Sequence, residues 1–598
     1  MAEQRSFVII DYVVFALFLC VSVGVGIYHA YKQHETEQRH KRENTKSQAT
    51  ADFLMGGRQM PIIPVALSLL TTFLSGVTML GTPAEIYQRG VLFWVYYVTA
   101  SLAFAISGLF FIPIFTQLRP ISIYEYFEHR FGSRLMRQCA AAIFLIYALF
   151  YMGVVLYSPA IALSGVSGAP AWPWILVIGA VCTLYTSIGG LKAVVWTDTL
   201  QACFMYIGVT VMIVKGINDS GGLTHVWTTA RELGRFEVLK NWDPNPMQHN
   251  SMWISTFGAF AFWMCQYGLN QMAVQRYCSL RDLKSSRIVI LITVPCFVIL
   301  GSIACFIGVI MVAFFDVDCD PLDTREYKAD QLVIVFAVRT LRSIPGLPGL
   351  FLACLFSSTL STFSSGMNSQ AAVLWEDFLK PIFGHWSEQR CAVLNKLLVL
   401  MFGCGATALA FAAGPMGGIM TASFSLLGAV AGPLVGLFFL GVFVPQANKY
   451  GAGIALLVAV LVSVTMAMGN FITKPFRYYR LPANDTCFDY TNLTFWQDSR
   501  NSIAIYGDPS VSAFFRVSNY LYPLIGVLLV LVVGTLLSCL IRKGDHSLTD
   551  AERDRRMALT FYGKLKGLDW ERLATDDVGN NDDPYEDGGL CLKEKWSG

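Results

Sequence analysis

PGLPGLFLACLFSSTLSTFSSGMNSQAAVLWEDFLKP, residues 345–381, is apolar over a length that crosses a membrane, yet seven of the nine residues from 357 to 365 carry a hydroxyl. A bilayer core about 30 Å thick takes about 20 apolar residues as a helix, so this stretch is predicted to be a transmembrane helix. Ser358, Ser361, Thr362 and Ser365 share one face of it, at spacings of three and four residues. Two interpretations of that face stay open. Small residues let membrane helices pack closely, and hydroxyls with freed carbonyls supply the oxygen ligands of a hard cation such as Na+.

The rest of the chain repeats the apolar pattern. Of its 598 residues 54% are hydrophobic and 14% are charged, whereas soluble proteins carry about 25% charged residues. This composition excludes a cytosolic enzyme, a disordered scaffold and a secreted disulfide-rich module, and a net charge of +3 is too small to indicate nucleic acid as a partner. We therefore predict an all-α polytopic protein of the lipid bilayer with thirteen transmembrane helices. They are expected near residues 8–30, 60–82, 91–115, 138–163, 172–188, 193–215, 252–272, 285–315, 347–374, 391–413, 416–442, 450–470 and 519–541.

Basic residues and glycosylation sequences predict the orientation. A run of lysines and arginines between 32 and 46 follows the first span, and positive flanks stay cytoplasmic, so the N-terminus is expected outside the cell. Alternation then places Arg276 in an inner loop and the polar tail, 542–598, inside, where disorder is expected. Sequons for N-glycosylation fall in loops expected outside, at Asn218, Asn484 and Asn492. Together these features predict a multi-pass glycoprotein of the plasma membrane.

The span 60–82 is unusually rich in hydroxyls and small residues. It carries Ser68, Thr71, Thr72, Ser75 and Thr78, with glycines at 76 and 81 and a proline at 83. An ordinary kinked helix and a helix broken in mid-membrane both agree with this composition. A broken helix exposes carbonyls to cations and points a helix N-terminus at anions.

The span 252–272 ends in aromatic and amide residues, Trp263-Met-Cys-Gln-Tyr267-Gly-Leu-Asn270-Gln271. An aromatic pair four residues apart, with amides on the adjoining turn, suits a site that stacks on a small solute and hydrogen-bonds to it. The same string also suits an aromatic belt at the membrane interface. The residues alone leave both interpretations open.

Ionisable residues inside the predicted spans are few. Asp11 lies near the outer end of the first span, and Asp198 lies near the inner end of another, where it caps a helix, bonds a neighbour or tunes a nearby cation. No lysine or arginine is expected within the membrane to pair with an anionic substrate. No chain of carboxylates or histidines crosses the membrane, which argues against a proton relay. Cys319 and Cys487 fall in outer loops, and a disulfide between them stays open.

Motifs of energy-coupled pumps and hydrolases are missing from the sequence. It holds no Walker loop, no zinc-binding pair and no GxSxG nucleophile motif. We therefore expect the protein not to be an enzyme, and we expect any transport to be driven by something other than ATP on this chain.

Five long strings of this sequence resemble the sodium:solute symporter family, in particular its branch of sodium-coupled monocarboxylate, multivitamin and iodide transporters. They are FLMGGRQMPIIPVALSLLTTFLSGVTMLGTPAEIYQRG (53–90), YMGVVLYSPAIAL (151–163), YTSIGGLKAVVWTDTLQ (185–201), YGLNQMAVQRYCSLR (267–281) and the stretch 345–381. In order and spacing the resemblance extends over roughly residues 8–470. The loop 471–518 and the tail match no string of the family.

The resemblance implies a LeuT-like fold of two inverted five-helix repeats, in which the first helix of each repeat is broken at the level of the substrate. It divides the chain into an extra helix (1–30, N-terminus outside), a cytoplasmic loop (31–59), the first repeat (60–215), an extracellular loop (216–251), the second repeat (252–442), two further helices with a glycosylated loop near 471–518 (443–541), and the cytoplasmic tail (542–598).

The resemblance also implies which residues form the sites. Na+ would be held by the side chains of Ser361 and Thr362 and the carbonyls of Thr71, Leu74 and Ser358, with Asp198 close by and with Ser75 and Ser365 at any second sodium. The substrate positions would be Phe73, Thr78, Tyr151, Trp263, Tyr267, Gln271, Ser423 and Phe424. The iodide transporter has glutamine at the position of Thr78, which weakens the resemblance to that member.

Taken with the hydroxyl-rich face, the resemblance implies a symporter that moves a small organic anion inward with Na+ as the coupling ion, by alternating access and without an organic cofactor. Monocarboxylates such as lactate, pyruvate, butyrate or nicotinate are the first expectation, and biotin and pantothenate, or iodide, are the alternative. A non-transporting sensor or an ion channel is the rival class. Accumulation of solute against its gradient distinguishes these classes.

Overall fold

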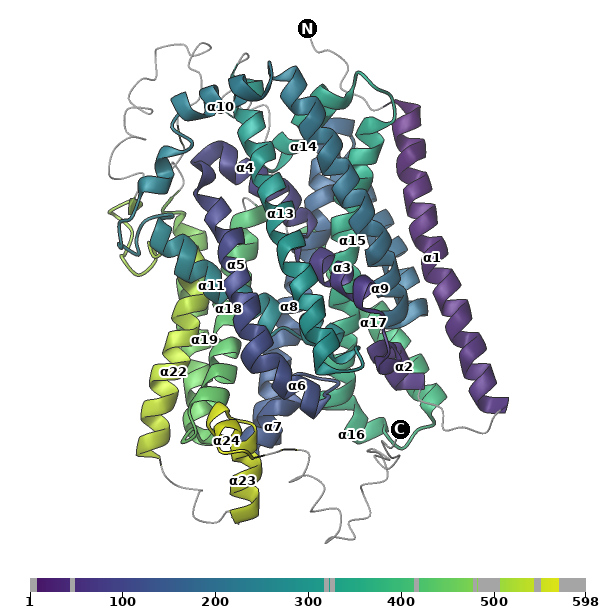
Figure 1. Ribbon diagram of the computed structural model, residues 1–598, viewed down its shortest axis with the longest axis vertical. Helices are drawn as coiled ribbons and strands as arrows, with labels where there is room; N and C mark the ends of the chain where they lie inside the picture. The colour runs from purple at the N-terminus through teal and green to yellow at the C-terminus, as the bar shows by residue number, and fades with distance from the viewer. Residues whose placement is uncertain are drawn as a thin grey trace.

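The computed structural model describes residues 8–42, 49–316, 322, 329–412, 419–476, 481, 506–541, 550–568 and 570. Within these ranges every regular element is a helix, and most helices stand side by side in one bundle (Figure 1). Ten described helices are long and apolar enough to cross a membrane, or eleven if the bent pair α3 and α4 is one span. The chain is therefore an all-α, multi-pass membrane protein, as the composition predicts.

The expected count of thirteen spans is not confirmed, and two regions account for the difference. The expected spans 172–188 and 193–215 both lie in α9 (Ala171–Asp219), which is continuous apart from an interruption at Gly190, where φ is 58°. This backbone conformation favours glycine, and a Cβ there would lie 2.5 Å from the Phe53 carbonyl oxygen. The expected span 252–272 consists of short segments, η5 (Ile254–Gly258), α11 (Ala259–Trp263) and η6 (Met264–Gly268).

The span expected at 60–82 is a broken helix. α3 (Ile62–Phe73) and α4 (Gly76–Arg89) meet at an angle of 55°. Between them Leu74 (φ −93°, ψ 71°) and Ser75 (φ −76°, ψ 172°) leave the helical conformation. A Cβ at Gly76 would lie 2.3 Å from Thr359 Oγ1, so a glycine at this position lets the broken helix approach α15 closely.

A second break precedes α12 (Gln271–Cys278). Leu269 (φ −136°, ψ 29°) and Asn270 (φ −104°, ψ 137°) separate it from η6. The Asn270 side chain caps α12 by accepting a hydrogen bond from the backbone N–H of Met272, 2.9 Å away. The first helix of each expected repeat is therefore broken, as the resemblance implies.

Long helices surround the two broken ones. They are α1 (Ile9–Arg42), α5 (Trp94–Ile106), α8 (Arg134–Ser167), α13 (Leu283–Phe315), α15 (Leu347–Leu374), α17 (Glu388–Ala412), α18 (Ile419–Phe443), α19 (Lys449–Thr473) and α22 (Tyr522–Leu540). α15 packs against α3, α8 and α9, and every residue from 351 to 373 is buried. The hydroxyl-rich stretch is therefore the central helix of the bundle.

Shorter helices cover the two ends of the bundle. α10 (Leu223–Glu232) lies at one end, called here the α10 end, and α7 (Glu125–Phe131) lies at the other, the α7 end (Figure 1). Asn218 is exposed near the last residue of α9, next to α10. Asn484, Asn492, Cys319 and Cys487 lie outside the described residues.

Part of the tail is helical, so the expectation of disorder is wrong for these residues. α23 (Asp550–Ala558) and α24 (Phe561–Leu565) lie at the α7 end (Figure 1). Phe561 packs against Phe110, with ring centroids 5.3 Å apart, and the Leu559 carbonyl accepts a hydrogen bond from the Tyr126 hydroxyl. Apolar side chains among the charged residues of the tail thus hold these two helices on the bundle.

Candidate functional site

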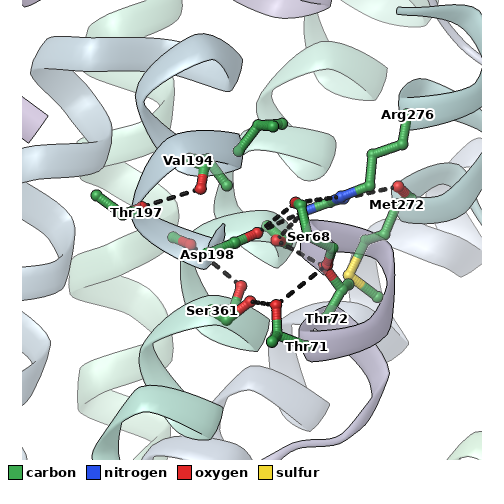
Figure 2. Close-up of polar contacts among 12 residues, drawn as sticks. Ser68, Thr71, Thr72, Val194, Thr197, Asp198, Met272, Arg276 and Ser361 are labelled. Carbon is green, nitrogen blue, oxygen red and sulfur yellow. Dashed lines mark hydrogen bonds and ion pairs between the residues drawn. The ribbon is translucent and has the colours of Figure 1, made fainter. Parts of the chain in front are cut away.

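The hydroxyl face of α15 meets the break between α3 and α4. Ser361 Oγ donates a hydrogen bond to Thr71 Oγ1 over 2.8 Å. Thr362 Oγ1 lies 2.8 Å from the Thr72 carbonyl and 3.1 Å from the Ser358 carbonyl. All of these side chains are buried, and Figure 2 shows Thr71 and Ser361 facing each other. The structure therefore brings together Thr71, Ser358, Ser361 and Thr362, which are among the residues expected to hold Na+.

Two backbone carbonyls at the same break are also free of backbone donors among the described residues. Because α3 ends at Phe73, the carbonyl oxygens of Thr71 and Leu74 accept no backbone hydrogen bond from any described residue. Two hydroxyls and several carbonyls match the preference of a hard monovalent cation, and neutral oxygens avoid placing a fixed charge in lipid. The residues present fit a bound Na+.

A buried ion pair that the sequence did not predict adjoins the hydroxyl face. Arg276 and Asp198 are both fully buried, with Arg276 Nη2 3.1 Å from Asp198 Oδ2. Ser68 Oγ bridges them: it accepts from Arg276 Nε over 2.8 Å and donates to Asp198 Oδ2 over 2.5 Å (Figure 2). The placement of Arg276 in an inner loop is wrong, and so is the expectation of no arginine within the membrane. After the second break the chain continues inside the bundle as α12, which is buried throughout.

The ion pair also reaches the oxygen atoms of α15. Arg276 Nη2 donates a hydrogen bond to Ser365 Oγ. Ser365 Oγ lies 3.2 Å from Thr72 Oγ1. Ser75, which was expected to act with Ser365 at a second sodium, instead lines a separate pocket. No hydrogen bond joins these two serines, and their shared role at a second sodium stays a prediction.

A pocket lies between the two broken helices. Six of the eight expected substrate residues line it: Phe73, Thr78, Tyr151, Trp263, Ser423 and Phe424. It is completed by Ser75, Val77, Phe93, Tyr97, Phe262, Gln266 and Leu427. Its free volume is about 30 Å³, room for one or two water molecules, so an organic solute requires these side chains to move.

Tyr267 and Gln271 do not line this pocket. The Tyr267 ring packs behind the lining, 4.5 Å from Phe73 and 5.6 Å from Trp263 between ring centroids. The Gln271 side chain bonds to backbone on its far side, donating to the Ile121 carbonyl over 2.7 Å and accepting from the Ile123 N–H over 2.8 Å. Gln271 therefore lies outside this pocket lining, and its substrate role stays a prediction.

Gln266 is the amide that reaches the pocket. Its Oε1 accepts a hydrogen bond from Asn270 Nδ2 over 3.1 Å, and Asn270 Oδ1 is held by the Met272 N–H. These contacts turn the Nε2 of Gln266 away from Asn270, and Nε2 bonds to no other described side chain or backbone group. The sequence signal was present in the Trp263–Gln271 string, but without the position of the break it does not distinguish Gln266 from Gln271.

A polar cluster closes the pocket toward the α10 end. Glu85 is buried, pairs with Arg89 over 2.5 Å, and accepts hydrogen bonds from His249 Nε2 and the Tyr520 hydroxyl, each 3.1 Å from Oε1. Burial and the neighbouring Arg89 lower the pKa of His249, so its imidazole is neutral at pH 7. The Tyr520 ring lies 5.4 Å from that of Phe424, which lines the pocket. This cluster was not predicted, because the span was expected to end at residue 82, whereas α4 continues to Arg89.

A second polar network closes the α7 end. Asp377 is bound by Arg137, and it accepts a hydrogen bond from Ser122 Oγ over 2.6 Å. The backbone N–H groups of residues 121 and 122 donate to Glu125 Oε1, each over 2.9 Å. Burial and the nearby Glu376 raise the pKa of Glu125 to about 7. The pocket thus lies between two polar closures, one at each end of the bundle.

Two discontinuous membrane helices that face one pocket, with freed carbonyls beside it, are the architecture of a secondary transporter. The chain belongs to the sodium:solute symporter family, whose model matches residues 53–459.

Individual relatives agree with this assignment. Sodium-coupled monocarboxylate transporter 1 of Homo sapiens is 34% identical over 98% of this chain and 95% of its own length. The sodium-dependent multivitamin transporter of Oryctolagus cuniculus is 38% identical over 78% of this chain and 72% of its own length. A solved structure of a substrate-bound, outward-open Na+-coupled sialic acid symporter matches with a TM-score of 0.71 and 21% identity, over 90% of this chain and 99% of that one. At that identity it supports the fold.

Proposed function

We propose that this chain is a sodium-coupled symporter of small monocarboxylates such as lactate, pyruvate, butyrate or nicotinate. The observation that carries the proposal is the contact of the Ser361 and Thr362 hydroxyls with the α3–α4 break, where neutral oxygens converge. Family membership and the monocarboxylate-transporter relatives support the same conclusion. Biotin and pantothenate are the second candidate class, favoured by the 38% identity to a multivitamin transporter.

The pocket suits a carboxylate because it offers neutral hydrogen-bond donors within an aromatic wall. Ser75 Oγ and Ser423 Oγ are buried and bond to no described partner, and the Gln266 amide faces the same space. A carboxylate accepts hydrogen bonds from hydroxyl and amide donors. The aromatic rings would pack on the short apolar part of the solute.

The broken helix would couple the ion to the solute. Thr71 and Leu74 would ligate Na+, while Phe73, Ser75 and Thr78 of the same break line the pocket. Na+ that fixes the conformation of this break therefore also places the pocket residues. By linkage, the solute then raises the affinity for Na+ by the same factor as Na+ raises the affinity for the solute.

Alternating access would require the two polar closures to open in turn. Opening at the α10 end would separate Glu85 from His249 and Tyr520, and opening at the α7 end would loosen the contacts of Asp377. We propose that the α10 end, with Asn218 and the N-terminus, faces outside and that the α7 end and the tail face the cytoplasm. Release into a low-sodium interior would then drive uptake.

Transport in proteoliposomes tests the proposal. We expect labelled lactate to accumulate against its gradient when Na+ is outside and not when choline replaces it. Unlabelled pyruvate, butyrate and nicotinate should compete, whereas glucose should not. Lactate uptake that continues in choline would contradict sodium coupling. Competition by biotin and pantothenate without competition by monocarboxylates would replace the substrate class and keep the coupling.

A further inference from the structure

A second and larger cavity lies away from the central pocket. Its volume is about 500 Å³, within the range of about 300–1,000 Å³ typical of sites for small ligands. It is formed at the α10 end by α10, the start of α5, the 3₁₀ turn η4 (Glu237–Lys240) and the outer third of α13. α10 packs directly on α13 here, and Figure 1 shows α10 at the same end of the bundle as the end of α13.

The walls of this cavity are largely apolar and aromatic. Trp227 and Phe236 form one side, with ring centroids 4.6 Å apart, and Phe306 of α13 lies on another. Trp94 Nε1 donates to Ser302 Oγ over 2.9 Å, so the indole satisfies its polar atom within the protein and leaves its carbon face to the cavity. These walls suit a hydrocarbon chain.

The cavity continues into a lipid-facing surface. Trp94, Val98 and Leu102 follow at intervals of four residues on α5 and are 41%, 40% and 55% exposed. Ile299 is 54% exposed on α13, one turn before Ser302 and two turns before Phe306, which line the cavity. Both helices belong to candidate membrane spans, so this apolar stripe faces acyl chains. Tryptophans at its upper edge agree with the preference of indole for the membrane–water interface.

A basic side chain, Arg231, lies at the end of the cavity that is nearest to solvent. Arg231 of α10 lines the cavity and is exposed, and its side chain pairs with no carboxylate among the described residues. Glu237, the acidic group of the lining, pairs with Lys240 over 2.7 Å. The cavity is apolar, opens to lipid and has the Arg231 guanidinium at its polar edge. This combination suits a ligand with an apolar chain and an anionic head.

We propose that the cavity holds a phospholipid of the adjacent leaflet, with one acyl chain between Trp94, Phe236 and Phe306 and the phosphate at Arg231. Guanidinium binds phosphate oxygens through paired N–H donors. A phospholipid would enter from the bilayer through the side of the cavity that opens to lipid. A solute arriving from water would not need this opening. The proposal depends on the membrane placement of α5 and α13 and is independent of the transported substrate.

The bound lipid would support the wall of the transport pocket. Val91 lines the lipid cavity and belongs to the 3₁₀ turn η2 (Val91–Phe93), whose last residue, Phe93, lines the central pocket. The Val91 N–H donates to the Arg235 carbonyl over 3.0 Å, which connects η2 to the chain that follows α10. Occupancy of the lipid cavity would therefore stabilise the position of Phe93.

Photolabelling of the full chain in proteoliposomes tests the proposal. The probe is phosphatidylcholine with a diazirine in one acyl chain, and labelled peptides are mapped by mass spectrometry. We expect enrichment at Phe236 and Phe306 over the exposed Leu291, which shares α13 but lies outside the cavity. Arg231→Ala should lower the cavity labelling about fivefold, equivalent to the ~1 kcal/mol of one basic residue at a membrane surface.

Two controls make the result decisive. Arg342→Ala removes another exposed arginine outside the cavity lining and should leave the labelling unchanged. A diazirine palmitic acid should label the cavity less than the phospholipid does. Equal labelling of Leu291 and the cavity, labelling insensitive to Arg231→Ala, or stronger labelling by the fatty acid would each overturn the assignment.

Discussion

The two helix breaks face the same pocket but treat their freed backbone groups differently. At the α3–α4 break, no side chain caps the helix that begins at Gly76, and the carbonyls of Thr71 and Leu74 stay without backbone donors among the described residues. At the break before α12, Asn270 caps the new helix and also holds the amide of Gln266.

The difference shows what each break contributes. Carbonyl oxygens that accept no hydrogen bond can coordinate a cation. The first break therefore suits a cation that would supply the missing partners of these oxygens. The second break is complete without a ligand and works as a fixed support, which carries Gln266 toward the pocket and Arg276 toward Asp198. The oxygen atoms at the first break are neutral. The charged residue that follows the second break, Arg276, is paired with Asp198 next to these oxygens.

Removing the charge supplied by the second break should have the largest effect. Arg276→Ala leaves the fully buried Asp198 carboxylate without its pair, and breaking a buried ion pair costs about 3–5 kcal/mol. We expect a marked fall in the thermal unfolding temperature of the purified protein. Arg281→Ala, an exposed arginine that follows the same helix, is the matched control. The double variant Arg276→Leu with Asp198→Asn should recover part of the loss; equal stability of Arg276→Ala and the control would refute the role of the ion pair.

Removing the hydroxyls of α15 that face the first break should act on sodium instead. Ser361→Ala with Thr362→Ala deletes two of the proposed oxygen ligands, each worth about 1 kcal/mol, so the Na+ concentration for half-maximal uptake should rise at least about tenfold. Ser357→Ala is the control, because its hydroxyl bonds to the Ala353 carbonyl of its own helix over 2.7 Å. A sodium curve that shifts equally in both variants, or in neither, would mean that the ion binds elsewhere.

Two substitutions at Asn270 separate its two tasks. Asn270→Ala loses both the cap and the contact with Gln266, whereas Asn270→Asp keeps an acceptor for the Met272 N–H and loses the donor to Gln266. We expect both to raise the KM for lactate about threefold to fivefold, and Asn270→Ala alone to lose about 1 kcal/mol of stability. An unchanged KM in Asn270→Asp would show that Gln266 needs no such orientation.

The closure at the α10 end should give a small pH effect. Burial and Arg89 lower the pKa of His249, so the native protein binds fewer protons there than a state in which His249 is hydrated. Stability from this group is present above the ordinary pKa of about 6.5 and is lost as pH falls from there toward the lowered value. Between pH 7.5 and 5.5 we expect the stability measured by thermal unfolding to fall.

Among the described titratable groups, Glu85 and Tyr520 contact His249 and Arg89 acts on it through its charge. Glu85 keeps its pairing with Arg89 in this pH range, because its pKa is lowered to about 2. His249→Gln retains a hydrogen-bond donor to Glu85 without the titration, and it should remove the pH-dependent part of the loss. The same pH profile in His249→Gln and the unmodified protein would assign the effect to another group.

Local patterns predicted much of the candidate site. Ser358, Ser361, Thr362 and Ser365 could be placed on one face because helical periodicity is a property of neighbouring residues. The glycines and hydroxyls of the span 60–82 agreed equally with a kinked helix and with a broken one. Only the resemblance to the family favoured the break at 74–75. Gln266 and Gln271 could not be distinguished, because they lie on opposite sides of a break whose position depends on packing.

The sequence by itself determined the membrane class, the long apolar helices and the sodium:solute symporter resemblance. Composition and periodicity depend only on neighbouring residues, so they can be read without the tertiary structure. Tertiary structure alone decided which polar groups meet. Arg276 has the local signature of a loop arginine, and it is buried because α12 continues inside the bundle toward Asp198, 78 positions earlier in the chain. A charge in the membrane is stabilised by the partner that the fold brings to it, and that partner is distant in sequence.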